Sequence, residues 1–229
     1  KGLTIVDAAS VITTHLAEIV KRHASDILSR QNVSDLVDQL KESNAAVVQE
    51  LIPSKMSVGS VHRVLQGLLR ERVSIRDLAV ILEVLADNAG RTQDVNLLAE
   101  LCRKTLGGHI CRDYISTSGT LNAIGVSPQL EDILRKHVRR EANELGALAL
   151  DPAVAQDVLL KIKAELDAAH RQDIQPVLLC SPLVRPHLRQ LIQHDFKDIA
   201  VISFAEVPDE VKVNMVSVLM PPDAAAGQP

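Results

Sequence analysis

The chain has 229 residues, of which 46% are hydrophobic and 24% charged, and its formal net charge is -4. This composition is typical of a soluble globular protein with room for one large or two small domains. Only 1% of the residues are aromatic, so the chain has few rings on which nucleic-acid bases could stack. Its net charge is negative, whereas nucleic-acid-binding proteins usually carry a basic surface, and we therefore expect no nucleic-acid partner.

The first half of the chain is dominated by apolar residues at helical spacing. We expect five amphipathic helices there, with starts marked by Asp7, Asn32, the 57–60 segment, Ser74 and Asp94. Ser74 is followed three residues later by Asp77, which is the spacing of a capping box. This half is therefore predicted to be nearly all helix, packed on aliphatic side chains.

The pattern changes at about Gly107. An apolar run, a capping residue followed by proline, and an amphipathic segment then recur three times, with the junctions at 127–128, 151–152 and 181–182. Serine or aspartate before proline is a helix start signal, because proline lacks the N–H group that would be unpaired there. Further strands are predicted near residues 199–202 and 211–215, and the alternation predicts an α/β unit.

These patterns predict an α+β fold, with a mostly helical subdomain to about residue 108 followed by a small α/β subdomain. Residues 221–229 are predicted to form a disordered tail. No apolar run approaches the roughly 18 residues that span a bilayer. The chain begins with Lys1 rather than methionine and has no signal peptide, so we expect it to be an excised fragment of a longer protein.

The three cysteines are too few for a disulfide framework and indicate a reducing compartment. Cys102 and Cys111, with His109 between them, lack the paired spacing of a zinc site, so we expect no metal. Cys180 ends a predicted strand before a helix start, where α/β enzymes often place a nucleophile. The alternative, a small apolar residue at the end of a buried strand, is favoured because no partner base can be assigned.

Other catalytic and cofactor motifs are missing from the sequence. It contains no GxxxxGK[ST] or GxGxxG loop and no HExxH pair, so we expect no cofactor and no enzymatic activity. His15 falls on the apolar face of the first helix, which favours a hydrogen-bonded core or interface histidine over a ligand.

A dense cluster of charges runs from the end of the third predicted helix into the fourth and comprises Arg70, Glu71, Arg72, Arg76, Asp77 and Glu83. One interpretation is a solvated face with local ion pairs, each of which is worth little. The other is a contact with a partner or a second subunit, where arginine is favoured because its guanidinium forms forked pairs with carboxylates.

Several blocks resemble the flagellar and type III secretion export-gate family (FlhA/SctV). In the first half they are Val11-Ile-Thr-Thr-His15-Leu, residues 19–24, residues 29–31 and the run LLRERVSIRDLAVILEVLAD. In the second half they are residues 148–152, 176–179, 183–187 and 200–206. The resemblance runs from about Thr4 to about Leu219. Residues 88–90 and 107–109 depart from the family pattern, which leaves a flagellar and an injectisome assignment both open.

The resemblance implies a bacterial inner-membrane protein whose cytoplasmic region forms a nine-fold ring, docks chaperone–substrate complexes and has no enzymatic role. Residues 1–31 would be the end of the first cytoplasmic subdomain and a linking helix. Residues 32–108 would be the helical subdomain, and residues 109–220 the closing α/β subdomain. The expected partners are other copies of the chain, export chaperones, exported substrates and other export-apparatus proteins.

The resemblance also assigns two sets of candidate residues. The ring contacts of the helical subdomain would involve Arg70, Arg72, Arg76, Asp77 and Glu83. The rim of the chaperone-docking groove would include Val6, Asp7, Val11 and Thr14. Two alternatives to an export gate remain at this point: a soluble helical adaptor that binds protein partners, and an α/β enzyme that uses Cys180.

Overall fold

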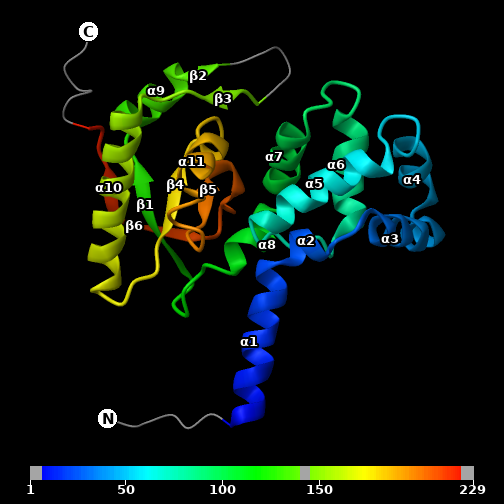
Figure 1. Cartoon of the computed structure of the whole chain (residues 1–229), viewed down its shortest axis with the longest axis horizontal. Coiled ribbons are helices and arrows are strands. Elements are labelled where there is room, and N and C mark those ends of the chain that lie inside the picture. Colours follow the sequence, from blue (N-terminus) through cyan, green and yellow to red (C-terminus); the bar gives the residue numbers. More distant parts are fainter. Residues whose placement is uncertain (1–6, 140–144, 223–229) are drawn as a thin grey trace. The chain divides into compact units, whose positions relative to one another are not determined.

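The computed structural model describes residues 7–139 and 145–222. The chain divides into two compact units, Lys1–Cys102 and Arg103–Pro229 (Figure 1). The first unit is helical, and the second combines helices with a small parallel sheet. This is the α+β fold that the sequence predicts. Among the described residues, no helix has both the length and the apolar character needed to cross a bilayer.

From residue 7 onward, the first unit contains six helices and most of a seventh: α1 (Ala8–Arg22), α2 (Ala24–Ile27), α3 (Arg30–Ser43), α4 (Ala45–Leu51), α5 (Val58–Arg70), α6 (Leu78–Asn88) and α7 (Val95–Thr105). Helix α5 packs against α2 and α3, and α4 packs against α3 and α6. The buried side chains of α5 and α6 recur every three or four residues, as a helix facing a core requires: Val61, Val64, Leu65, Leu68, Leu78, Ile81, Leu82 and Leu85.

Helix α2 is held against α5 by polar side chains as well as by packing. His62 Nε2 lies 2.7 Å from the Leu28 carbonyl oxygen. The amide of Gln66 donates to the Ser25 carbonyl oxygen at 2.9 Å. These bonds satisfy backbone acceptors at the end of a short helix that has few intrahelical partners for them.

The predicted helix starts at Asp7 and Asp94 are confirmed. The Asp7 carboxylate accepts the N–H of Ser10 at 3.0 Å, and Asp94 Oδ1 accepts the N–H of Asn96 at 2.8 Å. The start predicted at Asn32 is wrong, because α3 begins at Arg30 and its N-cap is Ser29. Asn32 is instead the second half of that capping box, since its side chain accepts the Ser29 N–H at 3.0 Å.

The capping box predicted for Ser74 and Asp77 is also wrong. Helix α6 begins only at Leu78, and the Asp77 side chain makes no capping hydrogen bond to it. The Ser74 hydroxyl instead accepts the N–H of Arg76 at 3.3 Å, inside the turn that precedes the helix. Serine hydroxyls often bond to neighbouring backbone in this way, in competition with a capping role.

The second unit follows with α8 (Gly107–Arg112), β1 (Thr120–Val126), α9 (Pro128–Lys136), β2 (Val138–Arg139), β3 (Ala147–Leu148), α10 (Pro152–His170), β4 (Val177–Cys180), α11 (Arg185–Ile192), β5 (Val201–Ser203), the 3-10 turn η1 (Phe204–Glu206) and β6 (Lys212–Leu219). The sheet has the order β5-β4-β1-β6, and its strands are all parallel. Strand β6 carries an irregularity in its pairing with β1, between the partners of Ala123 and Ile124.

One face of this sheet is covered by helices α9, α10 and α11 (Figure 1). The shared core contains alternate residues of the strands together with the inner faces of the helices: Ile124, Val126, Leu130, Leu134, Val158, Ile162, Leu166, Leu178, Cys180, Val184, Leu188, Ile192, Val201 and Leu219. Parallel strands are nearly continuously apolar where both faces of the sheet are covered, and β4 and β5 are buried along their whole length.

Two of the three predicted strand–cap–helix repeats differ in detail from the structure. Residues 147–148 pair antiparallel with β2 in a separate two-stranded ribbon rather than joining the main sheet, because the run around them alternates exposed alanines with half-buried leucines. Helix α11 begins at Arg185 rather than at Pro182. Ser181 and Pro182 precede it in a turn whose Ser181 carbonyl accepts the N–H groups of Val184 and Arg185.

Candidate functional site

The predicted ring-contact residues lie on the connection between α5 and α6 and along α6 itself. Arg70 is the last residue of α5, and Arg72 and Arg76 lie in the connection. All three arginines are exposed, as is Glu83 on α6, whereas Asp77 is half-buried beside the first turn of α6. Four of the five predicted side chains therefore have surface available for a partner.

Arg72 differs from the other residues of this set because its backbone is left-handed, with a φ of 59°. Its N–H donates to the Leu69 carbonyl oxygen, and the N–H of Val73 donates to the Leu68 carbonyl oxygen, each at 2.9 Å. This pair of bonds is the Schellman ending of a helix, and the left-handed position in it is usually glycine. Arginine thus occupies a position where a side chain is conformationally unfavourable.

Three of the four residues predicted for the groove rim belong to α1 and its N-cap. Val6 lies outside the described residues, and Asp7, Val11 and Thr14 are exposed. Helix α1 contributes no buried residue, and its apolar stripe faces solvent: Val11, Ile12, Leu16, Ile19 and Val20. His15 is likewise exposed, so it is not a core histidine.

An ion pair joins these two predicted surfaces. Arg72 Nη2 lies 2.8 Å from Glu18 Oε1 on α1, and both side chains are partly exposed. Sequence analysis missed this pair, because the two residues are far apart in the chain and neither stands in a motif that names the other. The structure therefore brings a residue predicted for subunit contact onto the helix predicted for chaperone docking.

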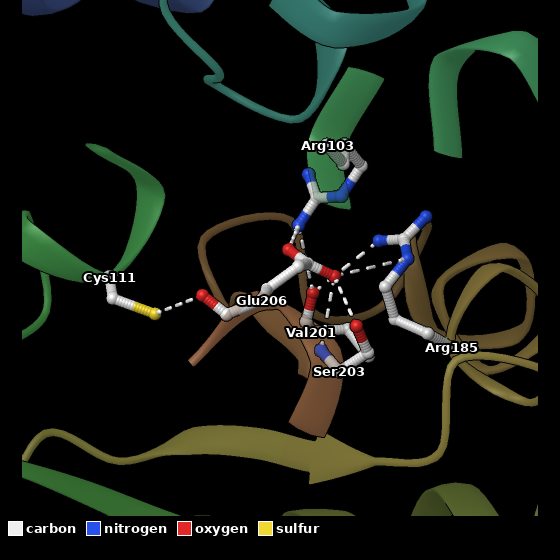
Figure 2. A network of polar contacts seen from close by, with 6 residues as sticks. All are labelled: Arg103, Cys111, Arg185, Val201, Ser203 and Glu206. Atoms are coloured by element: carbon white, nitrogen blue, oxygen red, sulfur yellow. Dashed lines mark hydrogen bonds and ion pairs between the residues drawn. The ribbon is translucent and has the colours of Figure 1, made fainter. Parts of the chain in front are cut away.

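The second unit contains a buried polar network centred on Glu206 (Figure 2). Arg103 Nη2 lies 2.7 Å from Glu206 Oε2 and also donates to the Val201 carbonyl oxygen at 3.2 Å. The other carboxylate oxygen accepts the Ser203 N–H at 3.1 Å and the Ser203 hydroxyl at 2.8 Å. The guanidinium of Arg185 lies 4.0 Å from the same carboxylate.

This network holds the end of β5 and the η1 turn in place. The three charged side chains are between 1% and 4% exposed, so the carboxylate faces guanidinium groups and backbone rather than solvent. Removal of one partner of a buried ion pair leaves an uncompensated buried charge, which is strongly destabilising. The arrangement is therefore architectural and leaves no accessible surface for a ligand.

Part of the Glu206 network has a signal in the amino-acid sequence. Ser203 followed three residues later by Glu206 is the spacing of a capping box, and the structure contains that box. Arg103 could not have been found in the same way, because it is 103 residues away from Glu206 along the chain. Only the tertiary fold brings these two charges together.

The cysteines are placed where thiol chemistry is disfavoured. Burial raises the pKa of the Cys102 thiol to about 12. For Cys111, burial and then the nearby charge of Glu206 raise the thiol pKa to about 11, and its Sγ donates to the Glu206 carbonyl oxygen at 3.4 Å. The thiolate is the reactive and metal-binding form, so neither residue is poised for catalysis or ligation.

Cys180 is completely buried in the core beneath the helices of the second unit. A substrate cannot reach this thiol in the folded chain, which argues against Cys180 as a nucleophile although it does end strand β4. Within residues 7–139 and 145–222, no three histidine, cysteine or acidic side chains come together as a metal site.

Comparison with known proteins identifies relatives along nearly the whole chain. Residues 1–212 match the FHIPEP family. The flagellar biosynthesis protein FlhA of Bacillus subtilis is 34% identical over 218 residues, which cover 95% of this chain but 32% of the relative. This chain therefore spans about a third of the length of that relative.

Solved structures with the same fold come from type III secretion proteins. The C-terminal domain of InvA has a TM-score of 0.80 and 31% sequence identity, over 95% of this chain and 66% of that chain. The nonameric SctV-C of EPEC has a TM-score of 0.78 and 27% identity, over 91% of this chain and 62% of that chain. In sequence and in fold, the chain belongs to the FHIPEP family.

Proposed function

We propose that this chain is part of the cytoplasmic region of an export gate, in a flagellar-type (type III) secretion system at the bacterial inner membrane. In this role it assembles with other copies into a ring and docks chaperone–substrate complexes for export. The mechanism is binding and assembly, without covalent chemistry. The observation that carries the proposal is the family match over residues 1–212, together with the fold shared with the C-terminal domain of InvA.

Assembly into a ring is supported by the nonameric SctV-C of EPEC, whose fold this chain shares. The contact surface that we propose on this chain comprises Arg70, Arg72, Arg76, Asp77 and Glu83. Arg70, Arg76 and Glu83 are all exposed, so the proposed surface carries both signs of charge. Such a surface suits a head-to-tail contact, in which arginines of one copy pair with carboxylates of the next.

Docking of chaperone–substrate complexes is assigned to α1, with Val6, Asp7, Val11 and Thr14 at the rim of the groove. The exposed apolar stripe of this helix supports the assignment, because contiguous apolar surface on a soluble domain commonly marks a binding site. Other export-apparatus proteins are further expected partners. Anchoring of the parent protein in the inner membrane is part of the same proposal and concerns the regions of the relatives that this chain does not span.

Native mass spectrometry of the chain, before and after Arg76→Glu, tests the proposal. We expect the unaltered chain to form assemblies of several copies and the variant to shift toward monomer, because a reversed charge opposes its partner in every contact. The matched control is Lys163→Glu on α10, an equally exposed charge reversal in the second unit, which should leave assembly unchanged. A chain that is monomeric with and without the substitution would favour a soluble adaptor over a ring.

A further inference from the structure

Helix α1 lacks the usual means of fixing a helix in place. It buries no side chain, and its apolar residues Val11, Ile12 and Leu16 are 53%, 67% and 59% exposed. Most helices in globular proteins are oriented by the burial of one face. The orientation of α1 within the first unit therefore depends on polar contacts and on its short connection to α2. Helix α2 follows directly at the C-terminal end of α1 (Figure 1).

The polar contact in question involves the strained arginine at the end of α5. Arg72 Nη2 lies 2.8 Å from Glu18 Oε1, with 35% of the Arg72 side chain and 42% of the Glu18 side chain exposed. The arginine holds a φ of 59°, a conformation that favours glycine. An arginine at such an unfavourable position motivates the hypothesis that its side chain has a specific role.

We propose that Arg72 is a positioning residue whose ion pair with Glu18 sets the orientation of α1 relative to α5 and α6. The pair adds little to global stability, because half-exposed ion pairs contribute at most about 1 kcal/mol. A helix without buried anchors needs no more than that, since about 1 kcal/mol corresponds to roughly a fivefold preference for one orientation. The inference deepens the proposed function, because α1 carries Asp7, Val11 and Thr14.

Pulsed electron paramagnetic resonance on the full 229-residue chain tests this role. Spin labels at Thr13→Cys on α1 and Gln39→Cys on α3 report the distance between the two helices, and both sites are exposed whereas the native cysteines are buried. In the Glu18→Arg and Arg72→Glu variants, we expect the population at the native distance to fall about fivefold relative to the populations at other distances. The charge-swapped double variant should regain the native distribution.

Arg70→Glu is the matched control, because it reverses an exposed charge two residues away and should leave the distance unchanged. Native distributions in both single variants would overturn the proposal, as would a double variant no better than the singles. Arg72→Gly adds a second readout. This substitution should broaden the distribution of distances between the two labels. The midpoint of thermal unfolding should stay equal or rise, because glycine adopts the left-handed backbone conformation without steric cost. A lower midpoint with an unchanged distance would instead mark Arg72 as purely structural.

The distance measurement is independent of ring assembly and of chaperones. Failure of the Arg72 proposal would therefore leave the native mass spectrometry result unaffected. Conversely, a chain that never assembles could still show α1 released by Arg72→Glu.

Discussion

At the scale of single residues, the second unit depends on a close approach of two backbone segments. A Cβ atom added to Gly107 at the start of α8 would lie 2.3 Å from the Glu206 carbonyl oxygen and 2.7 Å from its Cα. Atoms cannot approach so closely, so any side chain at this position must move the η1 turn. Because the Glu206 carboxylate is bonded on several sides, that turn has little freedom to move.

Gly107→Ala is therefore expected to lower the free energy of unfolding by about 1–3 kcal/mol, the usual cost of overpacking, as measured by urea denaturation. The neighbouring substitution Gly108→Ala is the control, since its added Cβ would meet Pro208 Cγ at an ordinary 3.7 Å. It should leave stability unchanged or raise it by about 0.5–1 kcal/mol, because alanine is the better helix former. Equal changes in the free energy of unfolding for the two substitutions would contradict this account, because they would show that the η1 turn moves at little cost.

The charge of the Glu206 side chain is expected to contribute more to the stability of the fold than its size does. Glu206→Gln keeps the shape of the side chain but leaves Arg103 buried without its counter-charge, which typically costs about 3–5 kcal/mol of unfolding free energy. Glu210→Gln, an exposed change in the same segment, should stay within about 0.5 kcal/mol.

A double-mutant cycle with Arg103→Met tests whether the cost of Glu206→Gln comes from the ion pair. The loss of unfolding free energy in the double variant should be smaller than the sum of the losses in the two single variants, because each substitution removes the other residue's partner. Strict additivity would mean that Arg103 and Glu206 contribute independently.

At the scale of helices and strands, the sequence predicts helix starts well where the cap and its target are adjacent in the chain. Asp7, Asp94, Ser127 and Asp151 all cap the helices that follow them. The prediction failed at Ser74, because its hydroxyl bonds inside the preceding turn instead. Local spacing cannot decide between these two uses of a serine, since both satisfy a nearby N–H group.

The cap of α1 gives this helix a pH dependence. Hydrogen bonds from the Ser10 hydroxyl and then from the Ser10 N–H lower the pKa of Asp7 from its ordinary value of 3.8. A lowered carboxyl pKa means that the cap stabilises α1 above about pH 4 and is lost as the pH falls through the folded-state pKa. We expect the Cα chemical shifts of residues 8–11 to lose helical character on acidification.

Asp7→Asn is the control for this titration, because asparagine caps helices equally well but does not ionise. Its first turn should keep its helical shifts across the same pH range. Asp7→Ala should lack the cap at every pH. A first turn that frays identically with pH in the unaltered chain and in Asp7→Asn would contradict a role for the Asp7 charge.

At the scale of the whole molecule, the order of the longer helices and of the main strands was predictable, whereas the short helices α2 and α4 and the long-range contacts were not. Strands β1, β4 and β5 of the main sheet follow apolar runs of the sequence, and β6 follows the further strand predicted near residues 211–215. The α+β division follows the change of pattern near Gly107. The pairs Arg72–Glu18 and Arg103–Glu206 join distant segments. Their chemistry is ordinary in sequence, and only the fold specifies which charge meets which. The division into residues 1–31, 32–108 and 109–220 that the family resemblance implies remains a prediction.

The central claim is that this chain belongs to a membrane-anchored export gate, and the reading frame upstream of Lys1 tests it most directly. Sequencing of the mRNA is expected to show, in frame upstream of the Lys1 codon, several apolar stretches of about 20 residues. Each would be long enough to span a bilayer. An initiating codon close to Lys1, with no such stretch, would contradict the claim and leave a shared fold serving a soluble adaptor.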